Sequence, residues 1–473
     1  KKHIGPETQV EIDLYNYIKK LLNLEKFSID DNLFSLGLDS LFAIELSNFI
    51  SEKYNVNIST KLILENNTIL NLEDYINSHK AKESSTNIDV ETEDITPGEK
   101  SVYLEWLKNP SNTLYNAPFE LKLDTSIDVD LLKECILKTI YNNKNMCATY
   151  SIVNNEITKS FEQKAYDITV EKVSEKEYYL IKENFAKPFN LNQFPLFRIK
   201  IYITEKNVYV LLDIHHIIFD GSSFIVFMNE VSNRYNGINV KENDKDIKIS
   251  VSDSLMEESK KFYLDEFAND IPVNDLPYDK PREKERKFIG AHISLPIDGE
   301  LTKKVDGFIK SNSLTLNSFM QTAFSIMLSK YTYSEDLIYG IAYSGRDSKD
   351  LEDVIGMFVR TIPYRVNIDW NENIIDFVKS MQKQTLNYIY YSNYSYDNLV
   401  KDLEIPRLSN RNALFDVMFV CQNMHIDTFK FGHTVAKFNP VERKTAKFDF
   451  SFEVIPASDN IKINLEYDTE LFS

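Results

Sequence analysis

Two adjacent histidines end an apolar run, in the segment His215-His216-Ile-Ile-Phe-Asp220-Gly221 that follows residues 208–214. An imidazole, whose ordinary pKa is about 6.5, accepts or positions a proton at neutral pH. A backbone N–H near Gly221 is suited to stabilise the oxyanion that forms when a nucleophile attacks a carbonyl group. These residue types therefore indicate acyl transfer to an amine, which sheds a proton as it attacks.

The histidine pair has two other interpretations. A metal site is disfavoured because adjacent strand residues point to opposite faces, and no third histidine lies nearby in the sequence. We therefore expect no metal. A purely structural role, in which core histidines bond to the backbone, stays open. The alternation of side chains predicts that one histidine faces a reaction channel while the other anchors the core.

A second segment with chemical potential is Asp31-Asn-Leu-Phe-Ser-Leu-Gly-Leu-Asp39-Ser40-Leu41, which ends a loop and opens a helix. An exposed hydroxyl at a helix N-terminus is a favourable position for a phosphodiester, because the helix dipole stabilises negative charge there. The alternative is that Ser40 or Asp39 only caps the helix. A capping box is not indicated, since residue 43 is Ala. On these residues alone, both interpretations stay open.

Composition bounds the class of protein. The chain has 473 residues, of which 43% are hydrophobic, so about three folding units with substantial cores are expected. Acidic residues outnumber basic ones by 72 to 54, giving a net charge of −18. This balance disfavours a nonspecific nucleic-acid binder and binding to an anionic membrane surface. No apolar run approaches the roughly 20 residues that a membrane span needs.

The cysteines and the first residues indicate the compartment. Three scattered cysteines exclude a disulfide framework and a four-cysteine zinc site, and they favour a reducing cytoplasm. The chain starts at Lys1 rather than Met and shows no signal peptide, so we expect an excised fragment.

The pattern along the chain predicts a multidomain protein. Residues 1–80 have helical apolar spacing and predict a small helix bundle, and the polar residues 81–94 predict a linker. Residues 95–473 form one large α/β region, divided into lobes at 95–268 and 269–473 by a proline-rich connection over 268–288.

The α/β region contains two expected strands and a helix beside the histidine pair. Residues 198–204 alternate like a strand, and residues 208–214 are almost continuously apolar, like a strand buried on both faces. Residues 224–235 have helical spacing. The histidines therefore lie where a buried strand leads into a helix.

Residues 1–80 resemble a carrier (thiolation) domain of an assembly-line synthetase, through the helical stripe, Asp31-Asn-Leu-Phe34 and Leu36-Gly-Leu-Asp-Ser-Leu41. The resemblance implies a four-helix fold in which Ser40, preceded by Asp39, carries 4′-phosphopantetheine attached by a separate transferase. Leu38 departs from the glycine usual in peptidyl carriers. The donor is therefore left open between a peptidyl, fatty, polyketide or other acyl group.

Residues 95–473 resemble a condensation domain of nonribosomal peptide synthetases, because HHxxxDG is followed two residues later by Ser223. The resemblance implies two chloramphenicol-acetyltransferase-like lobes around a tunnel. It implies that His216 is the key histidine, as a base or an orienting group. His215 and Asp220 would be structural, with Asp220 paired to an arginine, and Gly221 would admit the acceptor arm. Further similar stretches are Tyr115-Asn116, Phe189–Arg198, Ile355–Val359, Arg407–Asn412, Phe415–Asn423 and Leu465–Phe472.

The chain departs from this family pattern in places that bear on selectivity. Residues 142–150 replace the family's RHExLRTxF, so that Cys147 aligns with the arginine that often pairs with the motif aspartate. We therefore expect Asp220 to pair with Arg198 or Arg360. Arg360 replaces an asparagine of the family, and is expected either in the substrate channel, with Ser223, or as a solvated surface residue.

Together these features predict a carrier–condensation didomain that forms an amide between a carrier-bound acyl group and a downstream aminoacyl-carrier acceptor. The implied partners are a phosphopantetheinyl transferase, an upstream adenylation or acyl-loading domain and a downstream carrier. A cytoplasmic monomer is expected. Two alternatives remain: an epimerisation domain of the same fold, and a non-catalytic module that docks carriers and recruits a partner. The stretch 415–423 favours the condensation version.

Overall fold

The computed structural model describes residues 4–473 apart from a set of short gaps. These gaps are 23, 25, 34–35, 37–39, 55, 57, 59–61, 64–65, 67, 80–94, 154–155, 163, 244–250, 406–407, 409, 423–427, 442 and 457–459. For 40–44, 48, 108, 152–153, 156 and 440 only the backbone is described. The predicted linker at 81–94 and the predicted site residue Asp39 therefore lie outside the described residues.

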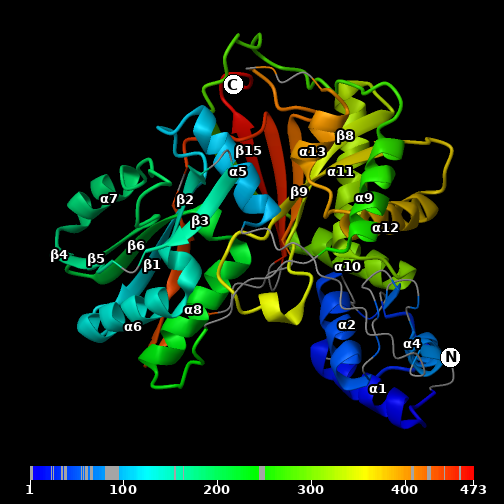
Figure 1. The fold of residues 1–473 in the computed structure, drawn as a ribbon, viewed down its shortest axis with the longest axis horizontal. Coiled ribbons are helices and arrows are strands. Elements are labelled where there is room, and N and C mark those ends of the chain that lie inside the picture. The colour runs from blue at the N-terminus through cyan, green and yellow to red at the C-terminus, as the bar shows by residue number, and fades with distance from the viewer. Residues whose placement is uncertain are drawn as a thin grey trace.

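The N-terminal unit is helical, as its apolar spacing predicts (Figure 1). Its described helices are α1 (Gln9–Leu21), α2 (Ser40–Tyr54) and α4 (Ile69–His79). Helix α1 begins with a capping box, in which the Thr8 hydroxyl accepts from the Glu11 amide and the Glu11 carboxylate accepts from the Thr8 amide. Buried apolar side chains from all three helices share one core.

The first lobe, or N-lobe, is built on a five-stranded sheet in the order β13-β1-β6-β5-β4. These strands are β1 (Asn116–Asp124), β4 (Thr169–Lys172), β5 (Phe197–Ile203), β6 (Asn207–His215) and β13 (Lys437–Pro440). The neighbouring elements are α5 (Pro97–Lys108), α6 (Val129–Asn142), η1 (Lys144–Cys147), β2 (Ala148–Val153), β3 (Glu156–Phe161), α7 (Glu175–Glu183), η2 (His216–Ile218) and α8 (Gly221–Tyr235). Strand β6 is buried along nearly its whole length, which explains its continuous apolar sequence.

The second lobe, or C-lobe, is built on a six-stranded sheet in the order β7-β15-β14-β10-β8-β9. Its strands are β7 (Gly290–Pro296), β8 (Asp336–Tyr343), β9 (Arg360–Asn367), β10 (Val417–Cys421), β14 (Phe450–Pro456) and β15 (Ile461–Asp468). The other elements are α9 (Asp253–Glu266), α10 (Gly299–Asn312), α11 (Leu316–Thr332), η3 (Lys349–Leu351), α12 (Ile374–Tyr390) and α13 (Tyr396–Asp402). The short strands β11 (Lys430–Phe431) and β12 (Thr434–Val435) instead contact α8 and β1 of the N-lobe. Helix α11 packs on both β8 and β10.

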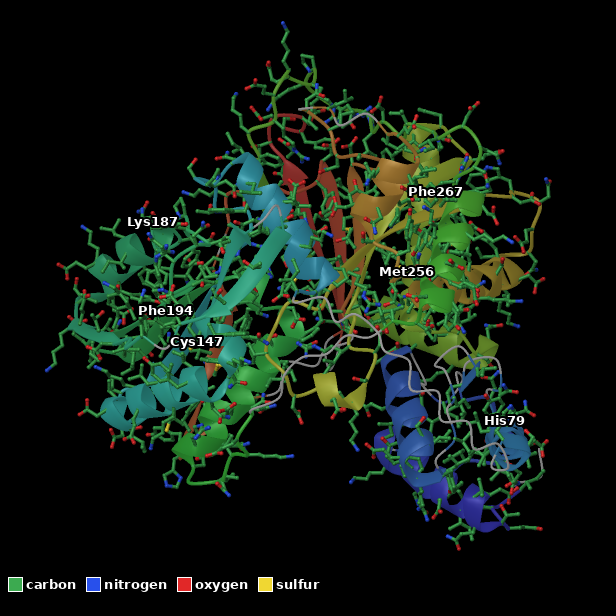
Figure 2. The ribbon with its side chains drawn as sticks, viewed as in Figure 1. His79, Cys147, Lys187, Phe194, Met256 and Phe267 are labelled. Carbon is green, nitrogen blue, oxygen red and sulfur yellow. The ribbon has the colours of Figure 1, made fainter. Side chains whose placement is uncertain are left out.

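The two lobes exchange elements. Helix α9 precedes the connection at 268–288, yet Tyr263 and Phe267 belong to the C-lobe core. Figure 2 shows Met256 and Phe267 beside the C-lobe, on the opposite side from Cys147 in the N-lobe. In return, β13 pairs antiparallel with β1 and extends the N-lobe sheet. The chain therefore enters the C-lobe near 253 and is back in the N-lobe core at Phe429, so that each lobe depends on residues from the other half of the sequence.

The helices of the described residues can be compared with the requirements for a membrane span. None of them combines the length and the apolar composition that crossing a bilayer requires.

Candidate functional site

The histidine pair sits where β6 ends, and its two rings have different surroundings. His215 is 3% exposed and its ring packs edge-on against Phe189. Its Nδ1 accepts a hydrogen bond from the backbone N–H of Ile217 at 3.2 Å, so its Nε2 carries the proton. Burial, and secondarily the neighbouring His216, lower the pKa of His215 to about 3. His215 is therefore a neutral core residue, in the structural role that the sequence left open.

His216 begins η2 and is only partly buried. Its Nδ1 lies 3.0 Å from the carbonyl oxygen of Phe219, which only accepts, so Nδ1 carries the proton and Nε2 has a free lone pair. Burial lowers the pKa of His216 to about 4, and the cations Arg443 and Lys447 add to this effect. The imidazole is therefore neutral at physiological pH, with one nitrogen fixed and the other able to accept a proton or a hydrogen bond.

Asp220 caps α8 and joins the two lobes. Its Oδ1 accepts from the Ser223 amide at 2.8 Å and from Nη2 of Arg346 at 2.8 Å, while its Oδ2 accepts from the Phe358 amide at 3.2 Å. The carboxylate is 2% exposed. Gly221 is the exposed first residue of α8. Its N–H is one of the helix-terminal groups that lack an intrahelical acceptor, which makes it available to an oxyanion.

The arginine that pairs with Asp220 is Arg346, so the expectation of Arg198 or Arg360 is wrong. Arg198 instead binds Asp213, with Nη1 and Oδ2 at 2.7 Å. Arg346 is itself 4% exposed and adds a hydrogen bond to the carbonyl of Val354 at 2.7 Å. In the sequence Arg346 stands in the short charged stretch Gly345-Arg346-Asp347, and only the C-lobe fold buries it.

The structure also corrects the expectation that Ser223 lines a substrate channel. Ser223 is fully buried, and its hydroxyl donates to the carbonyl of Gly356 at 2.9 Å and accepts from the Gly356 amide at 3.0 Å. The same oxygen lies 2.8 Å from Asp220 and 3.1 Å from Arg346. The hydroxyl is thus committed to holding α8 against the C-lobe segment.

Arg360, the residue that departs from the family's asparagine, is 6% exposed. Its guanidinium donates to Asp347 at 2.6 Å and to the hydroxyl of Ser392 at 3.0 Å. The interpretation as a solvated surface arginine is therefore wrong. Arg360 lines the cavity described next, in agreement with the channel interpretation.

A cavity of about 450 Å³ lies between α5 of the N-lobe and loops of the C-lobe. Tyr115 lines it, and the carbonyl of Tyr115 accepts the backbone N–H of His216 at 2.8 Å. Lys447 lines it too, with Nζ 4.6 Å from the centre of the Tyr115 ring. Burial lowers the pKa of Lys447, while Glu105 and Asp397, also in the lining, oppose this effect. The cavity thus carries charged side chains, and Tyr115 connects its wall to the backbone of His216.

The altered segment 142–150 still bridges the lobes. The amide of Asn145 donates to the carbonyl of Ile355 at 2.7 Å. Cys147, which aligns with the family's arginine, is buried in the N-lobe (Figure 2), and burial raises its pKa. The bridging interaction is therefore made by a neutral amide in this segment, while Arg346 supplies the charge from the C-lobe.

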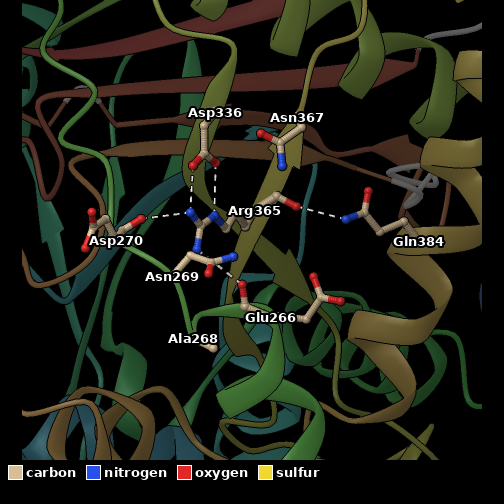
Figure 3. A pocket seen from close by; sticks show the side chains of 8 residues that line it. All are labelled: Glu266, Ala268, Asn269, Asp270, Asp336, Arg365, Asn367 and Gln384. Carbon is tan, nitrogen blue, oxygen red and sulfur yellow. Dashed lines mark hydrogen bonds and ion pairs between the residues drawn. The ribbon is translucent and has the colours of Figure 1, made fainter.

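A larger cavity, of about 620 Å³, lies elsewhere on the C-lobe and is shown in Figure 3. Its Arg365 is engaged with both carboxylate oxygens of Asp336, at 2.9 and 2.6 Å, and with the carbonyls of Glu266 and Asp270. This arginine ties α9 to the end of β8, which indicates a structural network. Over the described residues, no group of three or more His, Cys, Asp or Glu is placed to hold a metal ion.

Ser40 is the first residue of the 15-residue helix α2, as the loop-to-helix pattern predicts. Its side chain and the whole of Asp39 lie outside the described residues, so their roles stay predictions. A phosphodiester fits this backbone position, because the unpaired N–H groups and the dipole of the helix N-terminus favour an anion.

Comparison with known families identifies both parts of the chain. Residues 13–76 match the family described as phosphopantetheine attachment site, which holds that group on a serine, and residues 98–473 match the family described as condensation domain. The prediction of a carrier followed by a condensation domain is confirmed, and with it the fold class.

Relatives match over the whole chain but are much longer. The chain is 27% identical to surfactin synthase subunit 2 of Bacillus subtilis over 483 residues, covering 100% of the chain and 14% of that protein. It is 30% identical to bacitracin synthase 3 of Bacillus licheniformis, covering 99% of the chain and 8% of that protein. The chain thus spans a small part of each relative.

Solved structures show the same fold at low identity. A four-domain nonribosomal peptide synthetase in its holo form superposes with a TM-score of 0.70 at 17% identity, over 83% of this chain and 32% of that one. The X-domain from teicoplanin biosynthesis gives the same TM-score at 17% identity, over 83% of this chain and 92% of its own.

Proposed function

The chain belongs to the condensation domain family and carries a phosphopantetheine attachment domain ahead of it, and from that premise we propose that it joins an acyl or peptidyl group to the amine of a downstream aminoacyl-carrier acceptor in nonribosomal or hybrid polyketide–peptide synthesis. The observation that carries this proposal is the neutral His216, whose Nδ1 is fixed on Phe219 and whose backbone is bonded to Tyr115, a residue that lines the 450 Å³ cavity between the lobes.

Within the carrier, Ser40 is the proposed attachment residue and Asp39 its neighbour in the motif. When attached, phosphopantetheine supplies a thiol that holds the acyl group as a thioester and leaves as the amide forms. The helix N-terminus at Ser40 favours the phosphodiester that such an attachment creates.

In the condensation domain, His216 is proposed to orient the attacking amine. Its Nδ1 is fixed on the carbonyl of Phe219, which aims Nε2 as a hydrogen-bond acceptor. A pKa of about 4 makes the imidazole a weak base but keeps it neutral. It therefore favours accepting a hydrogen bond from the amine over holding the released proton. The Gly221 N–H, at the start of α8, is proposed to stabilise the oxyanion.

The remaining site residues are assigned supporting roles. We propose that Asp220 and Ser223 hold α8 and the C-lobe in register, and that His215 anchors the end of β6. Arg360 is proposed to shape the cavity that receives a substrate. Domain limits of 1–80 for the carrier, 81–94 for the linker and 95–473 for the condensation domain are part of the same proposal, with the boundary between the lobes moved from 268 to near 253, because α9 packs in the C-lobe core.

The proposal includes the partners and the compartment. A phosphopantetheinyl transferase would modify the carrier, an upstream adenylation or acyl-loading domain would charge it, and a downstream carrier would accept the product. Charge and cysteine usage favour a cytoplasmic chain that binds neither nucleic acid nor membrane. A monomer is proposed for this part of the synthetase.

The test is intact-protein mass spectrometry of single-turnover transfer. Ser40 is loaded with a panel of acyl-pantetheine groups, and a separate aminoacyl-loaded carrier is added. The expected result is loss of the acyl mass from this chain with a matching gain on the acceptor. His216→Ala should abolish the gain, whereas His433→Ala, at an exposed turn, should preserve it.

The same experiment separates the two alternatives. An epimerisation domain would retain the acyl group and exchange its α-proton with deuterated solvent. A non-catalytic docking module would show no transfer with any donor. Any residual mass gain on the acceptor would then be the same in His216→Ala. Either result would overturn the proposed amide formation.

A further inference from the structure

The carrier rests against one particular part of the C-lobe. Helix α2 contacts η3, and the Nζ of Lys349 lies 3.1 Å from Oε2 of Glu52. Leu386 of α12 packs against the apolar core of the carrier. Figure 1 shows the carrier helices at the lower edge of the C-lobe, away from α5 and α13, which line the 450 Å³ cavity. The contact therefore lies on a different side of the condensation domain from the cavity.

Carboxylates from both domains face each other at this contact. Glu352 follows η3 and is half-buried, while Glu45 and Glu52 come from α2. Burial raises the pKa of Glu352 to about 7, with Glu45, Asp353 and Glu52 adding to the effect and Lys349 opposing it. Lys349 thus offsets part of a repulsion that α2 brings to the C-lobe.

Tyr17 of α1 faces the same group of acids. Its hydroxyl lies 3.4 Å from the carbonyl oxygen of Glu45. Burial raises the pKa of Tyr17 to about 12, and Glu45, Glu352 and Glu52 add to that shift. The acids of α2 and of the η3 segment therefore form one cluster, and Tyr17 of α1 faces it.

The same segment is tied directly to the active-site motif. Arg346 donates to the carbonyls of Leu351 and Val354 through Nη1, and to Asp220 through Nη2 at 2.8 Å. Leu351 and Val354 form a small buried apolar cluster with Phe358, whose amide donates to Asp220. One guanidinium therefore connects the surface that the carrier touches with the residue that caps α8.

We propose that residues 349–354 are the docking surface from which this chain's own carrier delivers the acyl donor, with the Lys349–Glu52 ion pair as its charged contact. The inference rests on the proposed function, because it assigns the donor role to the carrier. It leaves the cavity lined by α5 and α13 on the opposite side free for the acceptor.

The acidic cluster makes docking depend on pH. When the carrier leaves, Glu45 and Glu52 move away from Glu352, so the pKa of Glu352 falls towards its usual range. The docked state therefore binds a proton more tightly than the undocked state. Docking is favoured below a pH of about 7 and weakens as the pH rises through it.

The test compares charge variants of the full chain by hydrogen–deuterium exchange and by single-turnover transfer. Lys349 and Glu52 are both well exposed, so their substitution leaves folding intact. Lys349→Glu should speed exchange in residues 349–354 and in α2, and slow transfer by roughly fivefold, the scale of one exposed ion pair. Lys349→Glu combined with Glu52→Lys should restore both. Lys304→Glu, in an exposed pair within α10, is the matched control and should change neither.

The outcomes distinguish docking from function. Unchanged exchange and transfer in Lys349→Glu would overturn the docking surface, as would a defect that the charge swap leaves in place. Exchange that responds and recovers, in a chain that transfers no acyl group at all, would support the docking surface while refuting its role in donor delivery. The protection factor of residues 349–354, which is corrected for the intrinsic increase of amide exchange with pH, should also fall between pH 6 and 8, and Glu352→Gln should flatten that fall.

Discussion

Asp220 in the N-lobe and Arg346 in the C-lobe form a buried ion pair, with Nη2 2.8 Å from Oδ1 and both side chains less than 5% exposed. The pair fixes the first turn of α8, which begins at Gly221 after the short helix η2 that His216 opens, against the segment that leads into β9. Because each lobe supplies one charge, the relative position of the lobes at the active site depends on this contact.

Removing the arginine should strongly destabilise the protein. Arg346→Met keeps the length of the side chain but leaves the Asp220 carboxylate buried without its counterion, which typically costs about 3–5 kcal/mol. The free energy of unfolding, measured with urea, is expected to fall by that amount. The double variant with Asp220→Asn should lose less than the sum of the two single variants. A loss of less than about 1 kcal/mol in Arg346→Met would contradict the stabilising role of the ion pair between Asp220 and Arg346.

This pair also shows which features of the site can be predicted from the sequence. The site at 215–221 is local, since a buried strand, a turn and a helix cap follow each other in the chain, and the structure has these elements as predicted. The partner of Asp220 is 126 residues away, and its choice depends on how the lobes dock. Arg198 is nearer in the sequence, but the pairing of β5 with β6 places it directly across from Asp213, which it binds instead.

Other features of the fold and the site are not predicted by any local sequence pattern. Lys447 lies in no recognised motif, and only the fold brings its ammonium over the ring of Tyr115. Helix α9 has an ordinary amphipathic sequence, and nothing in it tells which lobe its Tyr263 will enter. The contact between Lys349 and Glu52 joins two domains separated by a linker. In each case the tertiary structure decides which surfaces come into contact, and the sequence pattern does not distinguish between them.

The rate of acyl transfer should not depend on pH in the way expected for a histidine with an ordinary pKa. Because burial lowers the pKa of His216 to about 4, its neutral form is fully present above pH 5 and is lost only as the pH falls through 4. Single-turnover transfer is therefore expected to show no inflection near pH 6.5 that belongs to His216. The carrier-docking effect of Glu352 lies near this range, so the measurement uses the Glu352→Gln background. An inflection near 6.5 in that background would contradict the neutral, buried imidazole.

The nearby cations should tune His216. Arg443 and Lys447 both lower its pKa, with Arg443 the larger. Arg443→Met is expected to raise the pKa of His216, and Lys447→Met to raise it less, because each removes a positive charge that opposes the imidazolium. Titration of the labelled imidazole by NMR would measure both shifts. Lys444→Met, at an exposed neighbouring position, is the control and should leave the titration unchanged. A fall in the pKa on removing either cation would contradict this arrangement.

Arg360 should act on substrate choice. It lines the cavity and is held by Asp347 and Ser392, so Arg360→Asn enlarges the cavity and removes the cation beside Asp347, which keeps its hydrogen bond from the Tyr343 hydroxyl. We expect the relative transfer rates among competing aminoacyl-carrier acceptors to change by about tenfold, the effect of roughly 1.4 kcal/mol. A mixture of acceptors resolved by mass spectrometry gives these ratios directly. Arg360→Lys, which keeps the charge, should shift them less. Unchanged ratios in Arg360→Asn would show that the acceptor does not contact the part of the cavity that Arg360 lines.

The buried neutral His215 should make the fold sensitive to acid. Its pKa is about 3 in the folded chain and about 6.5 in an unfolded one. The unfolded state therefore binds the proton first, and stability is lost as the pH falls below 6.5, at about 1.4 kcal/mol for each pH unit. Between pH 6.5 and 5 this single residue should cost about 2 kcal/mol.

Comparison with His215→Asn isolates that contribution. The Asn oxygen can take the place of Nδ1 and accept the Ile217 amide, so the local fold is kept while the titrating group is removed. Urea denaturation at several pH values should show a slope below pH 6.5 that is shallower than in the original chain by about 1.4 kcal/mol per unit. His433→Asn, at an exposed turn, should reproduce the original slope. Equal slopes in all three chains would mean that His215 is charged in the folded state, and the assignment of His215 as the neutral anchor of β6 would fail.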